Sequence, residues 1–183
     1  RIGALLMNSR KPYQQGDLDG YCGPYCVINA HQYIVGPIYR EHAWAYLSEL
    51  MDHLNQKRPI KNRLLYGSSI NEIGMLFWKM EADYSLHRSM PYRRSRPTLA
   101  EFFLGLEQFL KVPNRLALIC LEHKHNHWTL VRKITAGRLL LFDSDGLKHV
   151  DKAHCSMIWE VDKTVHKINA SLTYFLQRGD EDA

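Results

Sequence analysis

One cysteine of the sequence stands where a reactive thiol is expected. Cys22 directly precedes Gly23-Pro24, and proline favours the first turn of a helix, so Cys22 is expected at the N-cap. A thiol attacks as its thiolate, and the positive end of a helix dipole stabilises that anion. Gly23 should let a substrate backbone come close, whereas Cys26 should point into the core. Cys22 is therefore predicted to be a nucleophile.

A nucleophilic thiol needs a base, and His127 is the histidine that the sequence favours. It opens a predicted strand, where a loop gives access and a sheet gives support. Asp143 ends the next predicted strand, and antiparallel pairing would bring it beside His127 to hold the second ring nitrogen. Each residue also has a purely structural interpretation, as a buried thiol, a core histidine or part of a turn. The three in this order favour a catalytic triad.

The elements that must position these residues divide the chain into a helical half and a strand half. Apolar residues at helical spacing predict helices from Gly23-Pro24 to Gly36-Pro37, over 40–54, from Ser69 onward and over 98–110. Short apolar segments between turn residues predict strands at 116–121, 127–134, 138–143, 171–177 and 82–87. Helices first and an antiparallel sheet afterwards indicate an α+β fold.

Composition and charge limit the remaining classes. With 183 residues, 45% of them hydrophobic, the chain can form one globular domain over 1–183 without disulfides. Its apolar stretches are too short to cross a bilayer, so we expect no membrane span. The four cysteines lack the spacing of a redox pair or a zinc site. We therefore expect reduced thiols, no metal, no cofactor and a cytoplasmic location.

The net charge of +5 raises the possibility of an acidic partner or of nucleic acid. The basic residues gather in one Pro-containing connector, at Arg88, Arg93, Arg94 and Arg96. That connector carries no known nucleic-acid-binding motif. We therefore expect no nucleic acid, and we interpret the cluster as a solvated loop or as a surface for an acidic partner or substrate.

Three runs of sequence resemble the papain-like cysteine peptidases. They are Cys22-Gly23-Pro24-Tyr25-Cys26-Val27-Ile28-Asn29-Ala30, His127-Trp128-Thr129-Leu130-Val131-Arg132-Lys133 and Leu141-Phe142-Asp143-Ser144. Within that group the pattern is similar to Josephin-type deubiquitinases and to bacteriocin-leader peptidases. The resemblance implies a papain-like fold, in which the nucleophile helix packs on a C-terminal antiparallel sheet. It also implies an upstream glutamine that completes an oxyanion hole with the Cys22 N–H; Gln15 is the first choice, with Gln14 and Asp19 as alternatives.

The implied activity is cleavage of a peptide or isopeptide bond in a protein or peptide substrate through an acyl-enzyme. The enzyme could process a leader peptide, or it could be a bacterial effector secreted into a host cytosol. Two other functions stay open, since the same triad serves acyltransferases and transglutaminases, and an inactive domain of this fold could bind peptides. The oligomeric state is not indicated by the sequence.

Overall fold

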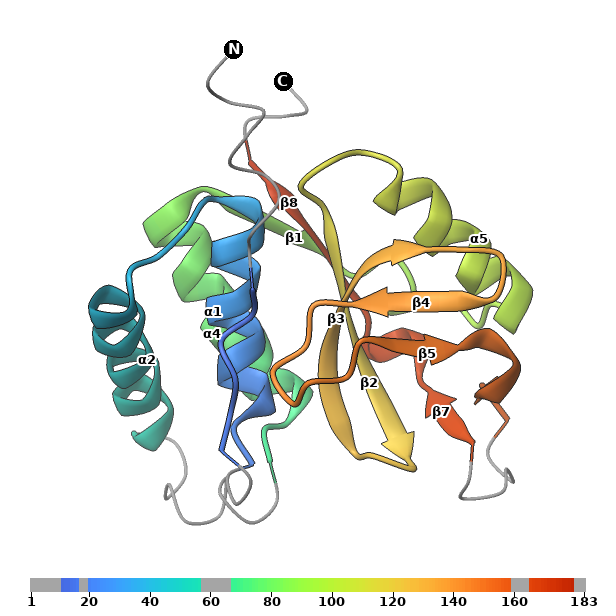
Figure 1. Cartoon of the computed structure of the whole chain (residues 1–183), viewed down its shortest axis with the longest axis horizontal. Helices are drawn as coiled ribbons and strands as arrows, with labels where there is room; N and C mark the ends of the chain where they lie inside the picture. Colours follow the sequence, from blue (N-terminus) through green and yellow to red (C-terminus); the bar gives the residue numbers. More distant parts are fainter. Residues whose placement is uncertain (1–10, 17–19, 57–66, 159–164, 180–183) are drawn as a thin grey trace.

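The computed structural model describes residues 11–16, 20–56, 67–158 and 165–179. In these ranges the chain forms four α-helices and a sheet that is antiparallel except for one short strand pair, which confirms the predicted α+β class (Figure 1). The helices are α1 Cys22–Ile34, α2 Arg40–Asn55, α4 Ile70–Tyr84 and α5 Leu99–Leu110. The strands are β1 Leu86–Ser89, β2 Leu116–His123, β3 His127–Ile134, β4 Arg138–Leu141, β5 His149–Asp151, β6 Cys155–Ser156, β7 His166–Ile168 and β8 Tyr174–Arg178.

Two of the helices begin with a capping box that their sequence encodes. The Ser69 side chain accepts the N–H of Glu72, and the Glu72 carboxylate accepts the N–H of Ser69 at 2.7 Å. Thr98 and Glu101 form the same reciprocal pair at the start of α5. Each box satisfies N–H groups that a helix leaves unpaired at its first turn.

The sheet has the strand order β1-β8-β2-β3-β4-β5, so β2 and β3 lie at its centre. β2 and β3 pair in antiparallel register, with Leu121 opposite His127. β3 pairs in turn with β4, with a bulge between Val131 and Lys133. Beside this row, β7 pairs with the end of β2, and β6 runs parallel to β7.

Alternate residues of the central strands enter two separate cores, one on each face of the sheet. Leu116 and Leu118 of β2 join a core with α1, α2 and α4. Ala117 and Ile119 join a second core, in which α5 contributes Phe102. Figure 1 accordingly shows α1, α2 and α4 on one side of the sheet and α5 on the other.

The structure corrects several predicted boundaries. The strand predicted at 82–87 is wrong in its first half, because α4 continues to Tyr84 and β1 begins at Leu86 after Ser85, which has a φ of 52°. The strand predicted at 171–177 starts later, after the 3-10 helix Ala170–Leu172, and β4 ends at Leu141. The short strands β5, β6 and β7 and the 3-10 helix Lys152–His154 were not predicted. The apolar segment 2–7 lies outside the described residues.

No helix within the described ranges is long and apolar enough to cross a membrane.

The capping box of α4 gives a test of the fold. We expect Ser69→Ala to lower the free energy of unfolding by about 0.5–2 kcal/mol, because it removes the acceptor of the Glu72 N–H. Urea denaturation measures the change. Ser95→Ala is the control, because the Ser95 side chain makes no hydrogen bond with other described residues. Equal stability of the two variants would contradict a stabilising role of the box.

Candidate active site

Cys22 lies at the start of α1, one position further into the helix than predicted. The N-cap is Tyr21, and no side chain of this residue caps the helix. Cys22 is therefore the first helical residue, and the first-turn N–H groups have no partner within the helix. Such N–H groups can donate to an anion near the sulfur.

A pocket of about 600 Å³ opens beside Cys22, and we call it the nucleophile pocket. Its lining residues come from the start of α1, the start of α4, the β2–β3 hairpin and the 3-10 helix Ala170–Leu172: Gly20, Cys22, Gly67, Ser68, Ser69, Ile70, Cys120, Asn126, Trp128 and Leu172. Cys22 is only 6% exposed. The thiol is thus accessible mainly through this pocket, as a nucleophile that acts on a bound substrate should be.

Gly23 has a packing role that the sequence did not predict. A Cβ at this position would lie 2.9 Å from the Cβ of Ser68, which is closer than side chains pack. Ser68 also accepts a hydrogen bond of 2.8 Å from Nε1 of Trp128 at its backbone carbonyl. The missing side chain of Gly23 therefore lets α1 pack against this segment, and the expectation that Gly23 also makes room for a substrate stays a prediction.

His127 and Asp143 meet as the predicted hairpin requires. The Nε2 atom of His127 lies 2.7 Å from Oδ2 of Asp143, and both side chains are buried. Asp143 follows the end of β4, where the Phe142 N–H still donates to the carbonyl of Leu130 on β3 at 2.8 Å. This bond keeps the chain beside β3 after the regular strand has ended.

The second carboxylate oxygen of Asp143 fixes the side chain in place. Oδ1 accepts the backbone N–H groups of Asp145 and Leu147, at 2.8 and 3.1 Å. The carboxylate is therefore bonded on both oxygens, and only Oδ2 faces the imidazole. This arrangement orients the His127 ring and leaves Nδ1 as the nitrogen available to the thiol.

The pKa shifts of the pair follow from these contacts. Burial tends to lower the pKa of His127, but hydrogen bonds to Asp143 and to Cys22, and the charges of both, raise it to about 10. Burial tends to raise the pKa of Asp143, but the hydrogen bond to His127 and its charge lower it below 3.8. An imidazolium beside an ionised carboxylate is thus favoured across neutral pH. Cys22 lies near enough to His127 to contribute to the shift of its pKa.

The upstream glutamines have different partners. The side-chain amide of Gln14 donates to the backbone carbonyls of Asp143 and Pro12, at 3.0 and 3.2 Å. The side-chain oxygen of Gln15 accepts the Ser144 hydroxyl at 3.3 Å, and its backbone N–H donates to the Ser144 carbonyl at 2.9 Å. The amide N–H₂ of Gln15 can therefore donate to another acceptor, whereas the amide N–H₂ of Gln14 already donates to two backbone carbonyls. Asp19 lies outside the described residues.

Cys26 and Cys155 are buried and Cys120 is partly buried, which reduces the reactivity of all three thiols. Cys26 is 1% exposed, and its thiol donates to the Trp128 carbonyl at 3.2 Å, as its predicted inward orientation requires. Burial raises the pKa of Cys26 well above 9.0 and raises the pKa of Cys120 and Cys155 to about 12. All four thiols are free. Within the described ranges no group of His, Cys, Asp or Glu side chains could hold a metal ion.

Sequence reasoning missed two residues of the site. Ser144 joins the Asp143 loop to Gln15, and it stands in the run that carries the resemblance, so its position was visible but its contact was not. Ser68 supports both Trp128 and Gly23, yet nothing in its local sequence distinguishes it from other loop serines.

No protein-family model matches the sequence, and no curated protein matches it either. The resemblance to papain-like peptidases therefore depends on the sequence around Cys22, His127 and Asp143.

Thiol labelling tests whether Cys22 differs from the other cysteines. At neutral pH, we expect iodoacetamide to modify Cys22 at least about ten times faster than Cys26, Cys120 or Cys155, because burial keeps those three protonated. Peptide mapping by mass spectrometry measures the rates. Equal labelling, or faster labelling of Cys26, would remove the case for Cys22 as the nucleophile.

The pH dependence of stability tests the His127–Asp143 pair. Stabilisation from the raised pKa of His127 is complete below 6.5 and is lost as the pH rises through about 10. Stabilisation from the lowered pKa of Asp143 is present above 3.8 and is lost as the pH falls. The difference in melting temperature between the natural chain and His127→Ala should therefore be largest between these limits, near pH 5 to 6, and smaller towards pH 10.

Asp145→Ala is the control for that measurement, because only its backbone N–H contacts Asp143. A difference for His127→Ala that stays constant from pH 5 to pH 10 would mean that His127 contributes packing and no charge.

Proposed function

We propose that the protein is a cysteine peptidase of the papain-like type. In this proposal Cys22 is the nucleophile, His127 is the general base and acid, and Asp143 orients the imidazole. The observation that carries it is the buried 2.7 Å contact between His127 and Asp143, on a histidine whose pKa also responds to Cys22. The papain-like arrangement is part of the same proposal, since α1 packs against β3 and brings Cys22 towards the start of that strand.

The chemistry begins with a pair of charges, in which the sulfur of Cys22 is a thiolate and His127 carries the proton at Nδ1 as an imidazolium. The sulfur then attacks the carbonyl carbon of a peptide bond, and the oxyanion accepts hydrogen bonds from first-turn N–H groups of α1 and from the amide of Gln15. Collapse of this intermediate breaks the C–N bond, and His127 gives its proton to the departing amine. Water, deprotonated by His127, then attacks the thioester, which releases the carboxylic acid and restores the thiolate beside the imidazolium.

Asp143 supports each proton transfer without receiving a proton itself. Its lowered pKa keeps the carboxylate charged while His127 carries its extra proton. The two backbone N–H groups on Oδ1 prevent the carboxylate from turning away. Such an orienting contact is worth several orders of magnitude in turnover in enzymes of this kind.

Peptide hydrolysis by the purified chain tests the proposal. A pooled library of fluorogenic peptides should be cleaved by the natural chain and not by Cys22→Ala or His127→Ala. Cleavage that persists in Cys22→Ala, or its absence from a chain whose Cys22 is rapidly alkylated, would contradict the proposal. An added amine separates the acyltransferase alternative, because a transferase forms an amide product in place of the acid.

The partners of the two glutamines give a matched pair of variants. We expect Gln15→Ala to lower kcat by about 10²–10³-fold, because its amide N–H₂ is available to the oxyanion. Gln14→Ala should stay within about ten-fold of the natural chain, since that amide donates to backbone carbonyls. A damaging Gln14→Ala beside a silent Gln15→Ala would reverse the assignment.

The orienting role of Asp143 is tested by a double variant. We expect Asp143→Ala to lower turnover by about 10²–10⁴-fold, whereas Asp145→Ala should have little effect. Asp143→Asn should also lose activity, because one amide oxygen is too few for both the imidazole and the N–H groups that Asp143 bonds. Cys22→Ala/Asp143→Ala should be no worse than Cys22→Ala, because residues that act together are not additive. Additive losses would contradict the triad.

A further inference from the structure

The basic cluster of the connector is held by a well-anchored turn. The N–H of Arg93 donates to the carbonyl of Met90 at 3.2 Å, and that of Ser95 to the carbonyl of Tyr92 at 3.3 Å. The ring of Tyr92 packs on Phe102 of α5, at 5.4 Å between centroids. The arginines of this turn therefore project from a fixed backbone and not from a loop without tertiary contacts.

A concave pocket of about 810 Å³ lies beside this turn, and we call it the basic pocket. In the part of the chain that the structure describes, its lining residues include no Asp or Glu: Arg93, Arg94, Ser95, Arg96, Pro97, Met157, Lys167, Ile168, Asn169, Ala170 and Ser171. Lys167 is paired with Glu122 at 2.6 Å. The three arginines are exposed, and among the described residues none of them has an acidic partner. The pocket therefore carries positive charge that the described chain does not neutralise.

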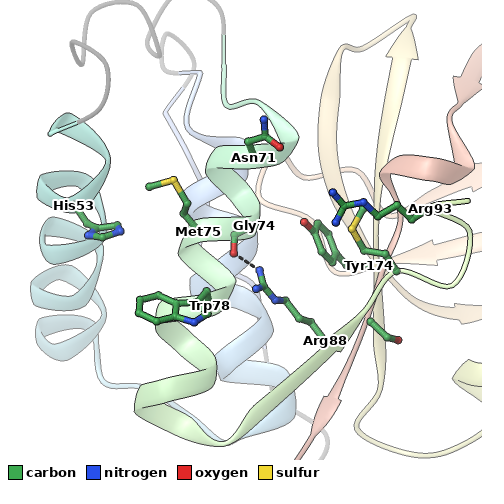
Figure 2. A pocket seen from close by; sticks show the side chains of 10 residues that line it. His53, Asn71, Gly74, Met75, Trp78, Arg88, Arg93 and Tyr174 are labelled. Carbon is green, nitrogen blue, oxygen red and sulfur yellow. Dashed lines mark hydrogen bonds between the residues drawn. The ribbon is translucent and has the colours of Figure 1, made fainter.

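Arg93 also lines a second cavity of about 830 Å³, which lies between α4 and strands β1 and β8 (Figure 2). Arg88 already has partners within the chain. It forms an ion pair with Glu81 at 3.1 Å, and it donates a hydrogen bond to the Gly74 carbonyl, which the dashed line in Figure 2 marks. Met75 and Trp78 add apolar surface, and Trp78 is 60% exposed. Arg93 lines both cavities. A ligand bound at Arg93 could therefore contact the exposed arginines of the basic pocket and the apolar side chains of the second cavity.

Residues that line each cavity are chain neighbours of residues that line the nucleophile pocket. Leu172 lines the nucleophile pocket, and its neighbour Ser171 lines the basic pocket. On α4, Ile70 lines the nucleophile pocket, and its neighbour Asn71 lines the second cavity. Since consecutive Cα atoms lie about 3.8 Å apart, an extended chain bound at Cys22 could continue directly into the basic surface.

We propose that Arg93, Arg94 and Arg96 bind an acidic segment of the polypeptide substrate, next to the bond that Cys22 attacks. This inference rests on the proposed peptidase function and adds the substrate class. A polypeptide fits better than a nucleic acid, because Met157 and Ile168 give the basic pocket apolar lining and none of its lining residues in the described ranges is aromatic, as base stacking would need. Carboxylates suit the arginine guanidinium, which can bond both oxygens of one group.

The test uses the full chain with Cys22→Ala, so that binding is measured without turnover. A fluorescein-labelled peptide that alternates Glu with Leu is the probe, and a peptide with Gln in place of Glu is its control. Fluorescence anisotropy compares Arg93→Gln/Arg96→Gln with the charge-matched Lys111→Gln/Lys133→Gln, whose lysines are exposed and lie outside both cavities. Iodoacetamide labelling of Cys22 in the same arginine variant, without Cys22→Ala, reports whether the nucleophile is intact.

We expect the Glu peptide to bind more tightly than the Gln peptide, with an affinity that falls as salt is added. The arginine variant should bind about ten-fold more weakly, as the loss of two exposed ion pairs implies, and the lysine variant should stay within about two-fold. Equal weakening in both variants, or equal binding of the two peptides, would overturn the proposal. Tighter binding of a single-stranded oligonucleotide, lost in the arginine variant, would assign the surface to nucleic acid.

These outcomes separate the two proposals. If Cys22 is unreactive but the arginine variant still loses the Glu peptide, the peptidase function fails and the acidic-peptide site stands as a binding site. If Cys22 is reactive and peptides are cleaved while the arginine variant binds normally, the peptidase stands and the acidic substrate class is wrong.

Discussion

The buried hydrogen bond between His127 and Asp143 is the contact that the surrounding loops are arranged to hold. Burial alone would oppose both charges, and the pKa shifts have the reverse direction because the two groups face each other at 2.7 Å. The N-terminal segment is bonded to the same loop, through Gln14 to the Asp143 carbonyl and through Gln15 to Ser144. A change in the conformation of that loop would therefore move the orienting carboxylate and the glutamines together.

The position of α1 follows from a second set of contacts, which join the first turns of the helix to Trp128 and Ser68. Trp128, the neighbour of His127, bonds Ser68 through its indole nitrogen and accepts the Cys26 thiol at its carbonyl. Ser68 in turn fills the space that the absent side chain of Gly23 leaves. Strand β3 thus sets the imidazole and also the start of the helix that carries the thiol. This common support explains how residues more than a hundred positions apart reach one site.

Local patterns were enough to predict the helices, the central strands and the contact between His127 and Asp143. Ser69 with Glu72 marks the start of α4 by residue type and spacing alone, and Thr98 with Glu101 does the same for α5. Features that depend on distant contacts were not readable. The strands β5 to β7 are two or three residues long, which is too short for a periodic pattern. The choice between Gln14 and Gln15 depends on bonds to a loop 129 positions away.

The central claim is that Cys22, His127 and Asp143 form one electrostatic unit, and the protonation of His127 is its most direct observable. Nuclear magnetic resonance of the imidazole nitrogens, in protein labelled with ¹⁵N-histidine, follows that protonation across pH. We expect the His127 ring to stay protonated through neutral pH and to titrate near 10, with its Nε2–H held by Asp143. Titration at or below 6.5, which is the direction that burial alone would give, would contradict the account.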